Sequence, residues 1–192
     1  LSDAFFKAAL GDGKWALTLR RTGEIVNKIP ARQILREVAR AAWECADPGI
    51  QYHDTIQRWH TCPAAGPIRA SNPCSEFMFI DDSACNLASL NLAAFWTGRD
   101  FDWSSFIQTA RILLLAQDIL VDYSSYPSAK IAENSHRFRP LGLGYANLGG
   151  VLMRMGHPYE SDAAVSFTQT VTAALHAVAL DFSAQMACEK GA

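Results

Sequence analysis

A short segment near the middle of the chain carries three side chains suited to radical or nucleophilic chemistry. It spans residues 71–76 and reads SNPCSE. Pro73 disfavours a helical backbone at the residue before it, so the sequence predicts an extended run in which alternate residues face the same side. Asn72, Cys74 and Glu76 would then project together over about 13 Å, at about 3.3 Å per residue. This row offers an amide for orientation, a sulfur for redox or nucleophilic work and a carboxylate for proton transfer.

The same residues also fit an ordinary structural role. Asn-Pro is a common turn signal, and a cysteine or a glutamate can occur in any strand. The spacing alone therefore leaves the functional and the structural interpretation open.

Other polar groups are weaker candidates for chemistry. His60 and Cys62 are close in sequence, but a catalytic pair needs its side chains within hydrogen-bond reach, so we expect them in packing or near the edge of a cofactor. Asp81 and Asp82 could bind a hard cation, although a solvated turn explains them better.

Two basic or glycine-rich segments could meet phosphate. His136, Arg137 and Arg139 could do so, or they could belong to a solvated loop. The glycines of residues 142–150 do not follow the GxGxxG spacing, and no acidic residue follows at the distance a dinucleotide site requires. Close packing of the start of a helix against a sheet is the better explanation of these glycines.

The cysteines indicate a reducing environment. Their odd number and the absence of a signal peptide argue against a disulfide framework, so we expect a cytoplasmic protein. No pair has CxxC spacing, and we expect no metal site. Two of them, Cys45 and Cys188, fall on helical patterns and are predicted to be buried and inert. The five are Cys45, Cys62, Cys74, Cys85 and Cys188.

Composition excludes some classes of protein. Of the 192 residues, 49% are hydrophobic and 19% are charged, which is typical of a folded chain. The net charge of −2 offers no basic excess for binding a nucleic-acid backbone, although a nucleotide pocket needs only a few local donors. The longest apolar run, around residues 112–116, is broken by Gln117 and Asp118, so no membrane crossing is predicted.

Hydrophobic periodicity predicts an α/β fold. Helices are expected over residues 3–10, 30–45, 103–122 and 161–189, and a hairpin over residues 15–26. Extended pieces are expected over residues 76–80 and 85–92, joined by a turn. Residues 51–70 and 127–139 are interpreted as irregular. Since the chain has no initiator methionine and ends just after a helical pattern, we expect residues 1–192 to be one partial domain of a longer polypeptide, without an internal boundary.

Several segments, in order along almost the whole chain, resemble the catalytic subunit of ribonucleotide reductase. The most specific are NPCSE at residues 72–76 and DDSACNLASLNL at residues 81–92. The segment RPLGLGYANLG at residues 139–149 follows them. CADPGIQ at residues 45–51 and WHTCP at residues 59–63 bring the chain closest to the adenosylcobalamin-dependent (class II) enzymes.

The resemblance implies a ten-stranded α/β barrel with a central finger loop that carries Cys74 at its tip. The thiyl radical of Cys74 would take the hydrogen from C3′ of a ribonucleotide, and Glu76 would act as general base on the 3′-hydroxyl. Asn72 would orient the ribose hydroxyls, and Ser71 would belong with Asn72 and Glu76 to the substrate-binding residues. Cys85 would be one of the two cysteines that supply the reducing electrons.

The same resemblance implies the cofactor and partners. Adenosylcobalamin would generate the radical, and thioredoxin or glutaredoxin would reduce the disulfide formed by Cys85 and a cysteine upstream of this segment. A homodimer is expected for the full-length protein, and this chain alone should be inactive.

Two alternatives are retained. A class I large subunit, with its radical supplied by a separate iron or manganese subunit, shares the Asn-x-Cys-x-Glu pattern; a class III enzyme fits less well, because that group does without the glutamate. The second alternative is a non-enzymatic α/β binding module with an incidental motif. It predicts that Cys74 is buried and inert, away from Asn72 and Glu76.

Overall fold

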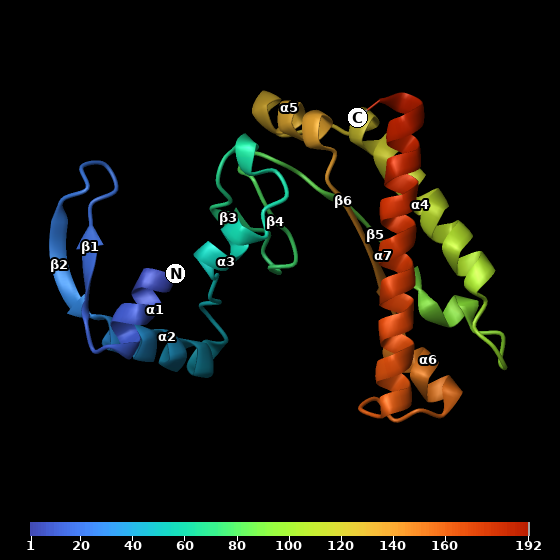
Figure 1. Ribbon diagram of the computed structural model, residues 1–192, viewed down its shortest axis with the longest axis horizontal. Coiled ribbons are helices and arrows are strands. Elements are labelled where there is room, and N and C mark those ends of the chain that lie inside the picture. Colours follow the sequence, from blue (N-terminus) through green and yellow to red (C-terminus); the bar gives the residue numbers. More distant parts are fainter. Residues whose placement is uncertain (192) are drawn as a thin grey trace. The chain divides into compact units, whose positions relative to one another are not determined.

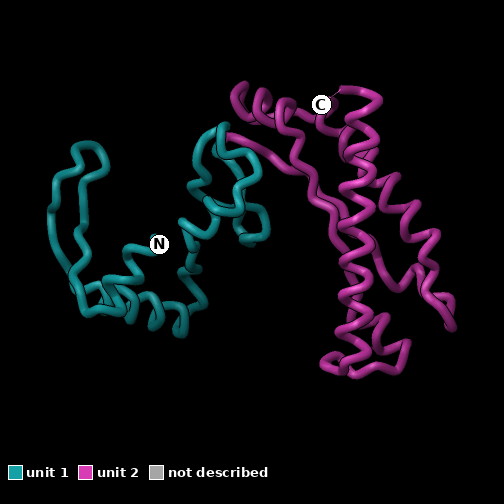
Figure 2. Tube along the Cα trace, viewed as in Figure 1, with its two compact units in different colours: residues 1–81 teal, residues 82–192 magenta. Residues whose placement is uncertain are grey.

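The computed structural model describes residues 1–191, which fall into two compact units. The first unit is Leu1–Asp81 and the second is Asp82–Ala192, and each is described by itself (Figure 2). The strands of the described residues form three separate two-stranded sheets, so this part of the protein does not close into a barrel by itself. The mixture of helices and strands confirms the predicted α/β class.

The first unit begins with a helix, a hairpin and a second helix, as predicted. They are α1 (Asp3–Leu10), β1 (Lys14–Thr18), β2 (Ile25–Pro30) and α2 (Ala31–Cys45) (Figure 1). The strands pair antiparallel. The Ser2 hydroxyl caps α1 by accepting a hydrogen bond from the Phe5 amide. A small core joins α1 to the start of α2 and contains buried Phe5, Ala9 and Ala31, with Trp15 and Ile34 packed against it.

The interpretation of residues 51–70 as irregular is wrong over one segment, which forms α3 (His53–Arg58); a single 3₁₀ turn, η1 (Pro63–Ala65), follows. Gln57 fixes α3 to the chain beyond it, because its side chain donates to the Ile68 carbonyl (2.6 Å) and accepts from the Ile68 amide (3.1 Å). A helix of six residues is too short to display a helical period in sequence. The unit ends with two short antiparallel strands, β3 (Ala70–Ser71) and β4 (Met78–Phe79).

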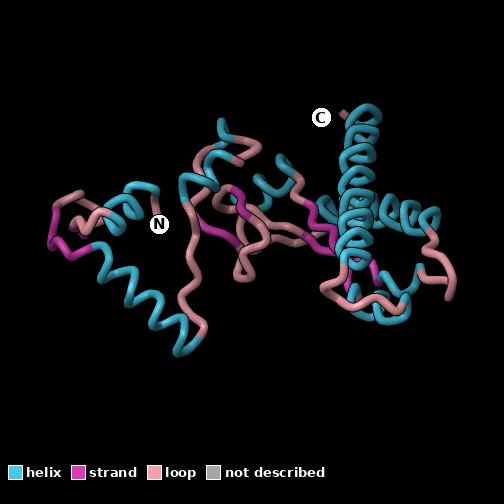
Figure 3. Tube along the Cα trace, turned by 60° about the horizontal axis from the view of Figure 1, so that its bottom comes forward, coloured by secondary structure: helices cyan, strands magenta, loops and turns pink. Residues whose placement is uncertain are grey.

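The second unit is built around a parallel pair of strands. It contains β5 (Asn86–Asn91), η2 (Leu92–Phe95), α4 (Trp103–Tyr123), α5 (Ala129–Phe138), β6 (Leu141–Ala146), α6 (Leu148–Met155) and α7 (Asp162–Lys190). Parallel strands need a long crossover, and α4 and α5 lie within it. Figure 3 shows α4 and α7 as the long helices of this unit, and α4 contacts β5, β6 and α7.

Aromatic and aliphatic side chains fill the space between these helices and the strands. Phe106 of α4 is fully buried, and its ring meets that of Phe95 edge-on at a centroid distance of 5.4 Å. The other buried members of this core are Leu90, Leu92, Phe101, Ala110, Val151, Val171 and Leu175.

The prediction of a loop over residues 127–139 is wrong, because most of this segment forms α5. Ser128 caps the helix by accepting from the Ile131 amide at 3.3 Å. Arg139 ends it with a left-handed backbone (φ 46°) and pairs with Asp118 and Asp122 of α4 at 2.7 and 2.8 Å. The hydrogen bond from Arg139 holds the pKa of Asp122 below its ordinary value. The polar surface of a short helix therefore resembled a loop in sequence.

Two helices, α4 and α7, are long and apolar enough to cross a membrane by length and composition alone. The sequence interpretation had excluded this by counting uninterrupted apolar residues, whereas mean hydropathy averages over a whole helix. Core helices of large proteins pass the same test. In this unit α4 also carries the buried polar side chain of Gln117 and the ion-paired Asp118 and Asp122.

We expect Phe106→Ala to lower the free energy of unfolding by about 3–5 kcal/mol, since a fully buried ring is replaced by a cavity. Chemical unfolding followed by circular dichroism measures the change. The control Gln108→Ala, at an exposed position of the same helix, should stay within about 0.5 kcal/mol of the parent. Equal effects of the two variants would contradict the core described above.

Candidate active site

Residues 72–75 form a tight turn between β3 and β4. The Ser75 amide donates to the Asn72 carbonyl at 3.1 Å, and the Asn72 amide donates to the Phe77 carbonyl at 3.2 Å. Ser75 has a left-handed backbone (φ 64°). The prediction of an extended row is therefore wrong: Pro73 occupies the second position of a turn, which proline favours, and the chain reverses so that β4 can pair with β3.

The turn still brings the three predicted chemical groups into one short loop. The Asn72 side chain shapes it, because Oδ1 accepts the Phe77 amide at 3.0 Å. Cys74, at the tip, and Glu76 are both exposed. This exposure contradicts the buried, inert Cys74 that the binding-module alternative predicts.

Gln51 holds the turn from outside, and the sequence interpretation did not predict this role. Its Nε2 donates to Ser71 Oγ at 3.0 Å and to Ser75 Oγ at 2.9 Å. Ser71 Oγ in turn donates to the Asn72 carbonyl at 2.8 Å. The partners are more than a dozen residues apart in sequence, so no local pattern reveals the contact; the one available signal was the resemblance of residues 45–51.

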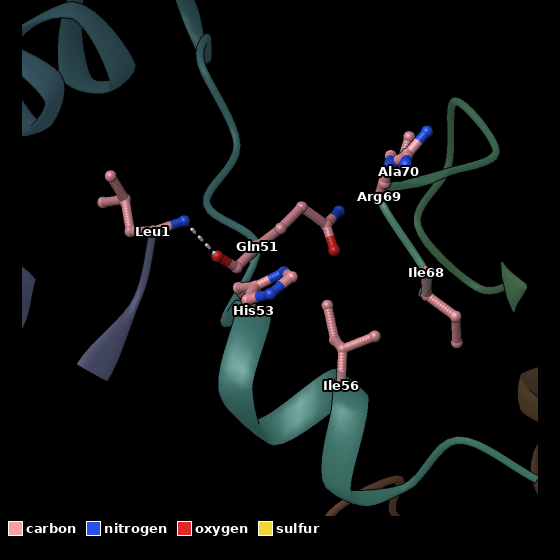
Figure 4. A pocket seen from close by; sticks show the side chains of 7 residues that line it. All are labelled: Leu1, Gln51, His53, Ile56, Ile68, Arg69 and Ala70. Carbon is pink, nitrogen blue, oxygen red and sulfur yellow. Dashed lines mark hydrogen bonds between the residues drawn. The ribbon is translucent and has the colours of Figure 1, made fainter. Parts of the chain in front are cut away.

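A small pocket of about 100 Å³ lies beside this support (Figure 4). Leu1, Gln51, His53 and Ile56 line one side of it, and Ile68, Arg69 and Ala70 line the other. Neither Cys74 nor Glu76 lines this pocket, so it does not coincide with the turn that carries the chemical groups.

His60 has a structural role in a neighbouring loop. Its Nδ1 accepts the Cys62 amide at 3.1 Å, and its Nε2 lies 2.9 Å from the Gly66 carbonyl, which assigns the proton to Nε2. Both ring nitrogens are engaged with backbone atoms, and no bond joins the ring to the Cys62 sulfur. The His60 ring therefore holds the backbone of its own loop, and the expectation that His60 and Cys62 do not form a catalytic pair agrees with this geometry.

The second unit contains the other predicted active-site cysteine, Cys85, just before β5. The sulfur is half-buried and donates a weak hydrogen bond to the Asn86 carbonyl at 3.5 Å. Gly142 of β6 faces it, and a Cβ added there would lie 3.3 Å from the sulfur and would clash with the end of the Leu87 side chain. Gly142 is therefore explained by the close approach of two strands. The expected packing of a helix start against the sheet does not explain Gly150, where an added Cβ would clash with the side chain of Asn147, the N-cap residue of the same helix α6.

A buried glutamine of α4, also absent from the predicted site, lies against the same strands. Gln117 is 3% exposed, and its Nε2 donates to the Asn86 carbonyl (3.1 Å) and the Gly142 carbonyl (2.7 Å). The Asn86 side chain returns a bond to the Gln117 carbonyl at 3.0 Å. The signal for this glutamine was its polarity within an apolar helical run, which had been interpreted only as a break in that run.

The remaining candidates are two cysteines and three charged residues. Cys45 and Cys188 are exposed in the described chain, so the prediction that they are buried is wrong; both lie at the end of a helix, where few neighbours cover them.

Arg139 is already paired with two carboxylates and is not a free phosphate ligand. Asp81 and Asp82 make ion pairs with Arg69 and Lys130 respectively. Among residues 1–191, no three potential metal ligands form a group.

Comparison with known proteins defines the class. The model of the ribonucleotide reductase barrel domain matches residues 1–192. A vitamin B12-dependent ribonucleotide reductase of Streptomyces coelicolor is 44% identical over 196 residues, which cover 100% of this chain and 20% of that protein. The protein of the same name from Rhodopirellula baltica is 54% identical over 162 residues, covering 84% of this chain and 16% of that protein.

A more distant relative is the vitamin B12-dependent ribonucleoside-diphosphate reductase of Mycobacterium tuberculosis. It is 33% identical over 192 residues, which cover 100% of this chain and 28% of that protein. This chain belongs to the ribonucleotide reductase family. It spans between 15% and 28% of the length of the relatives that it matches.

We expect Gln51→Leu to loosen the turn. Loss of two donated hydrogen bonds, each worth about 1 kcal/mol, should accelerate hydrogen exchange at the Ser75 and Phe77 amides by about thirtyfold. Hydrogen exchange with mass spectrometry of the peptide over residues 71–80 measures this. Gln33→Leu, at an exposed position of α2, is the matched control and should leave the exchange unchanged. Unaltered exchange in Gln51→Leu would show that the turn is stable without this support.

Proposed function

We propose that the protein containing this chain reduces ribonucleotides to 2′-deoxyribonucleotides, with the radical carried by Cys74. The observation that carries the proposal is the turn of residues 72–75, which presents the Cys74 thiol at an exposed tip beside Asn72 and Glu76. A family match over the whole chain supports it.

The chemistry divides among the side chains of the turn. The Cys74 thiyl takes the hydrogen atom from C3′, and Glu76 accepts the proton of the 3′-hydroxyl, so that the 2′-hydroxyl leaves as water. Asn72 has its Oδ1 engaged by the Phe77 amide, which leaves its Nδ2 to donate to a ribose hydroxyl. Ser71 shares in the substrate site by supporting the Asn72 carbonyl. At the end of the cycle Cys74 returns its hydrogen atom to C3′.

The two electrons of the reduction come from Cys85 and a second cysteine outside this chain. Each thiol gives one hydrogen equivalent, and the pair ends as a disulfide while the oxygen leaves as water. An external dithiol protein of the thioredoxin or glutaredoxin type then restores the thiols. The half-buried position of the Cys85 sulfur suits a group that must meet a substrate intermediate rather than bulk solvent.

Adenosylcobalamin is the proposed source of the radical, and two of the relatives described above carry vitamin B12 dependence in their names at 44% and 54% identity. When bound, it would supply a radical that takes the hydrogen atom of the Cys74 thiol and so leaves the thiyl. The exposed thiol at a turn tip fits this chemistry, because it can lose its hydrogen to a group that approaches from outside the turn.

We further propose that both units belong to one barrel domain, in which the turn of residues 72–75 is the tip of the central finger loop. The ten-stranded barrel would be completed by strands outside this chain. Homodimeric assembly and a cytoplasmic location are part of the same proposal.

In the whole protein, Cys74→Ser should abolish ribonucleotide reduction, because an oxygen at this position does not form the required thiyl radical. Glu76→Gln should lower kcat by about 10²–10⁴-fold through the loss of the general base. Product formation is measured with and without adenosylcobalamin, in the presence of an external dithiol.

Cys188→Ser, which removes an exposed cysteine of α7, is the control and should retain activity. Turnover that depends on a separate metal subunit instead of adenosylcobalamin would reassign the radical source and keep the roles in the turn. Full activity in Cys74→Ser would end the proposal.

A further inference from the structure

Cys85 is held by contacts that the reaction scheme above does not assign. The Asn86 carbonyl, which accepts the Cys85 thiol, also accepts one hydrogen bond from Gln117 Nε2. The same Nε2 reaches the carbonyl of Gly142, the residue that faces the sulfur from β6. One side-chain amide therefore ties together the two backbone segments that flank the thiol.

This arrangement does not have the pattern of a purely stabilising contact. Gln117 Oε1 and Asn86 Oδ1 are both buried and have no hydrogen-bond partner within residues 1–191. A buried acceptor without a donor destabilises a fold, whereas an apolar side chain of similar shape would pack in the same helix without that cost. Gln117 follows the apolar residues 112–116 of α4 and is buried, whereas the adjacent Asp118 is partly exposed and paired with Arg139.

The glycine at position 142 provides the second constraint on the sulfur. A methyl group there would lie 3.3 Å from Cys85 Sγ, which would require the sulfur to move by a few tenths of an ångström. Its other neighbour, the tip of Leu87, is 68% exposed and can turn away at little cost. The Asn86 carbonyl oxygen, at 3.5 Å, would be in ordinary contact, so once Leu87 has turned away Cys85 Sγ is the atom that a side chain at position 142 would displace.

We propose that Gln117 and Gly142 are positioning residues for Cys85: Gln117 fixes the carbonyl that orients the thiol, and Gly142 leaves the space in which the sulfur lies. This inference rests on the proposed function, which makes Cys85 a source of reducing electrons. Hydrogen-atom transfer from a thiol depends steeply on its placement, so a small displacement matters more for this sulfur than for a packing residue.

The test measures the thiol directly, in the reduced whole protein without cofactor. The rate of iodoacetamide alkylation of Cys85 is followed by peptide mass spectrometry, with the exposed Cys188 as internal reference. Gln117→Met keeps the length and removes the donor, and it should raise the Cys85 rate by about thirtyfold, the factor expected from losing two hydrogen bonds. The reference rate should change less than about twofold, since an exposed surface residue is little affected by a substitution elsewhere.

Gln108→Met, the same substitution at an exposed position of α4, is the matched control and should leave all rates unchanged. In steady-state turnover, Gln117→Met should lower kcat while the KM for the ribonucleotide stays the same, because Cys85 is not a binding group. A Cys85 rate equal to that of the control would overturn the proposal. A parallel rise at Cys85 and Cys188 would also overturn it, because it would reveal general loosening.

Gly142→Ala provides a second variant that leaves Gln117 unchanged and decides the matter if Gln117→Met does not fold. It should change the alkylation rate of Cys85 alone, and an unchanged rate would overturn the proposal. The proposed function and the positioning of Cys85 can be refuted independently of one another. Absence of ribonucleotide reduction by the parent protein would refute the proposed function, whereas the alkylation rates test the positioning of Cys85 without any turnover.

Discussion

The parallel pairing of β5 with β6 is the constraint on which the second unit depends. Parallel strands cannot be joined by a tight turn, so the chain must leave the sheet, build α4 and α5, and return. Parallel strands are usually covered by helices, and α4 covers this pair by contacting both β5 and β6. The apolar core around Phe106 and the ion pairs of Arg139 then fix the crossover.

Near each of the two cysteines with proposed roles, the neutral side-chain amide of a glutamine holds neighbouring groups by hydrogen bonds. Gln51 supports the turn beneath Cys74, and Gln117 supports the carbonyl next to Cys85. A lysine or arginine in either place would also supply donors, but its charge would favour the thiolate. Transfer of a hydrogen atom needs the protonated thiol, so an uncharged donor can order the backbone without changing the form of the sulfur that reacts.

The sequence was informative where a long period or a specific motif was present. The helices around residues 30–45, 103–122 and 161–189 were predicted because several turns of apolar spacing are hard to mistake. Two short helices, α3 and α5, were missed, since α3 is held by contacts with distant residues and α5 has a polar surface. β6 was not recognised as a strand because two glycines interrupt it, and its pairing with β5 involves residues more than forty positions apart.

The candidate residues were found from their types, but their geometry was not. Asn72, Cys74 and Glu76 lie in one short loop, and the prediction of an extended row was wrong because the pairing of β3 with β4 decides the local backbone. Gln51 had no local signature and Gln117 only its polarity within an apolar run, since the partners of both are brought to them by folding.

Asn72 occupies its position for two physical reasons at once. Its side-chain oxygen Oδ1 accepts a hydrogen bond from the Phe77 amide and so stabilises the turn, while its side-chain nitrogen Nδ2 is the group that we propose donates to the substrate. Truncation to alanine would remove both, so lost activity in such a variant would not distinguish a deformed loop from a lost ligand contact. Aspartate keeps the acceptor and discards the donor, which separates the two contributions. The position thus admits very few side chains, and a comparison of natural sequences there would reflect the demands of loop shape as much as those of catalysis.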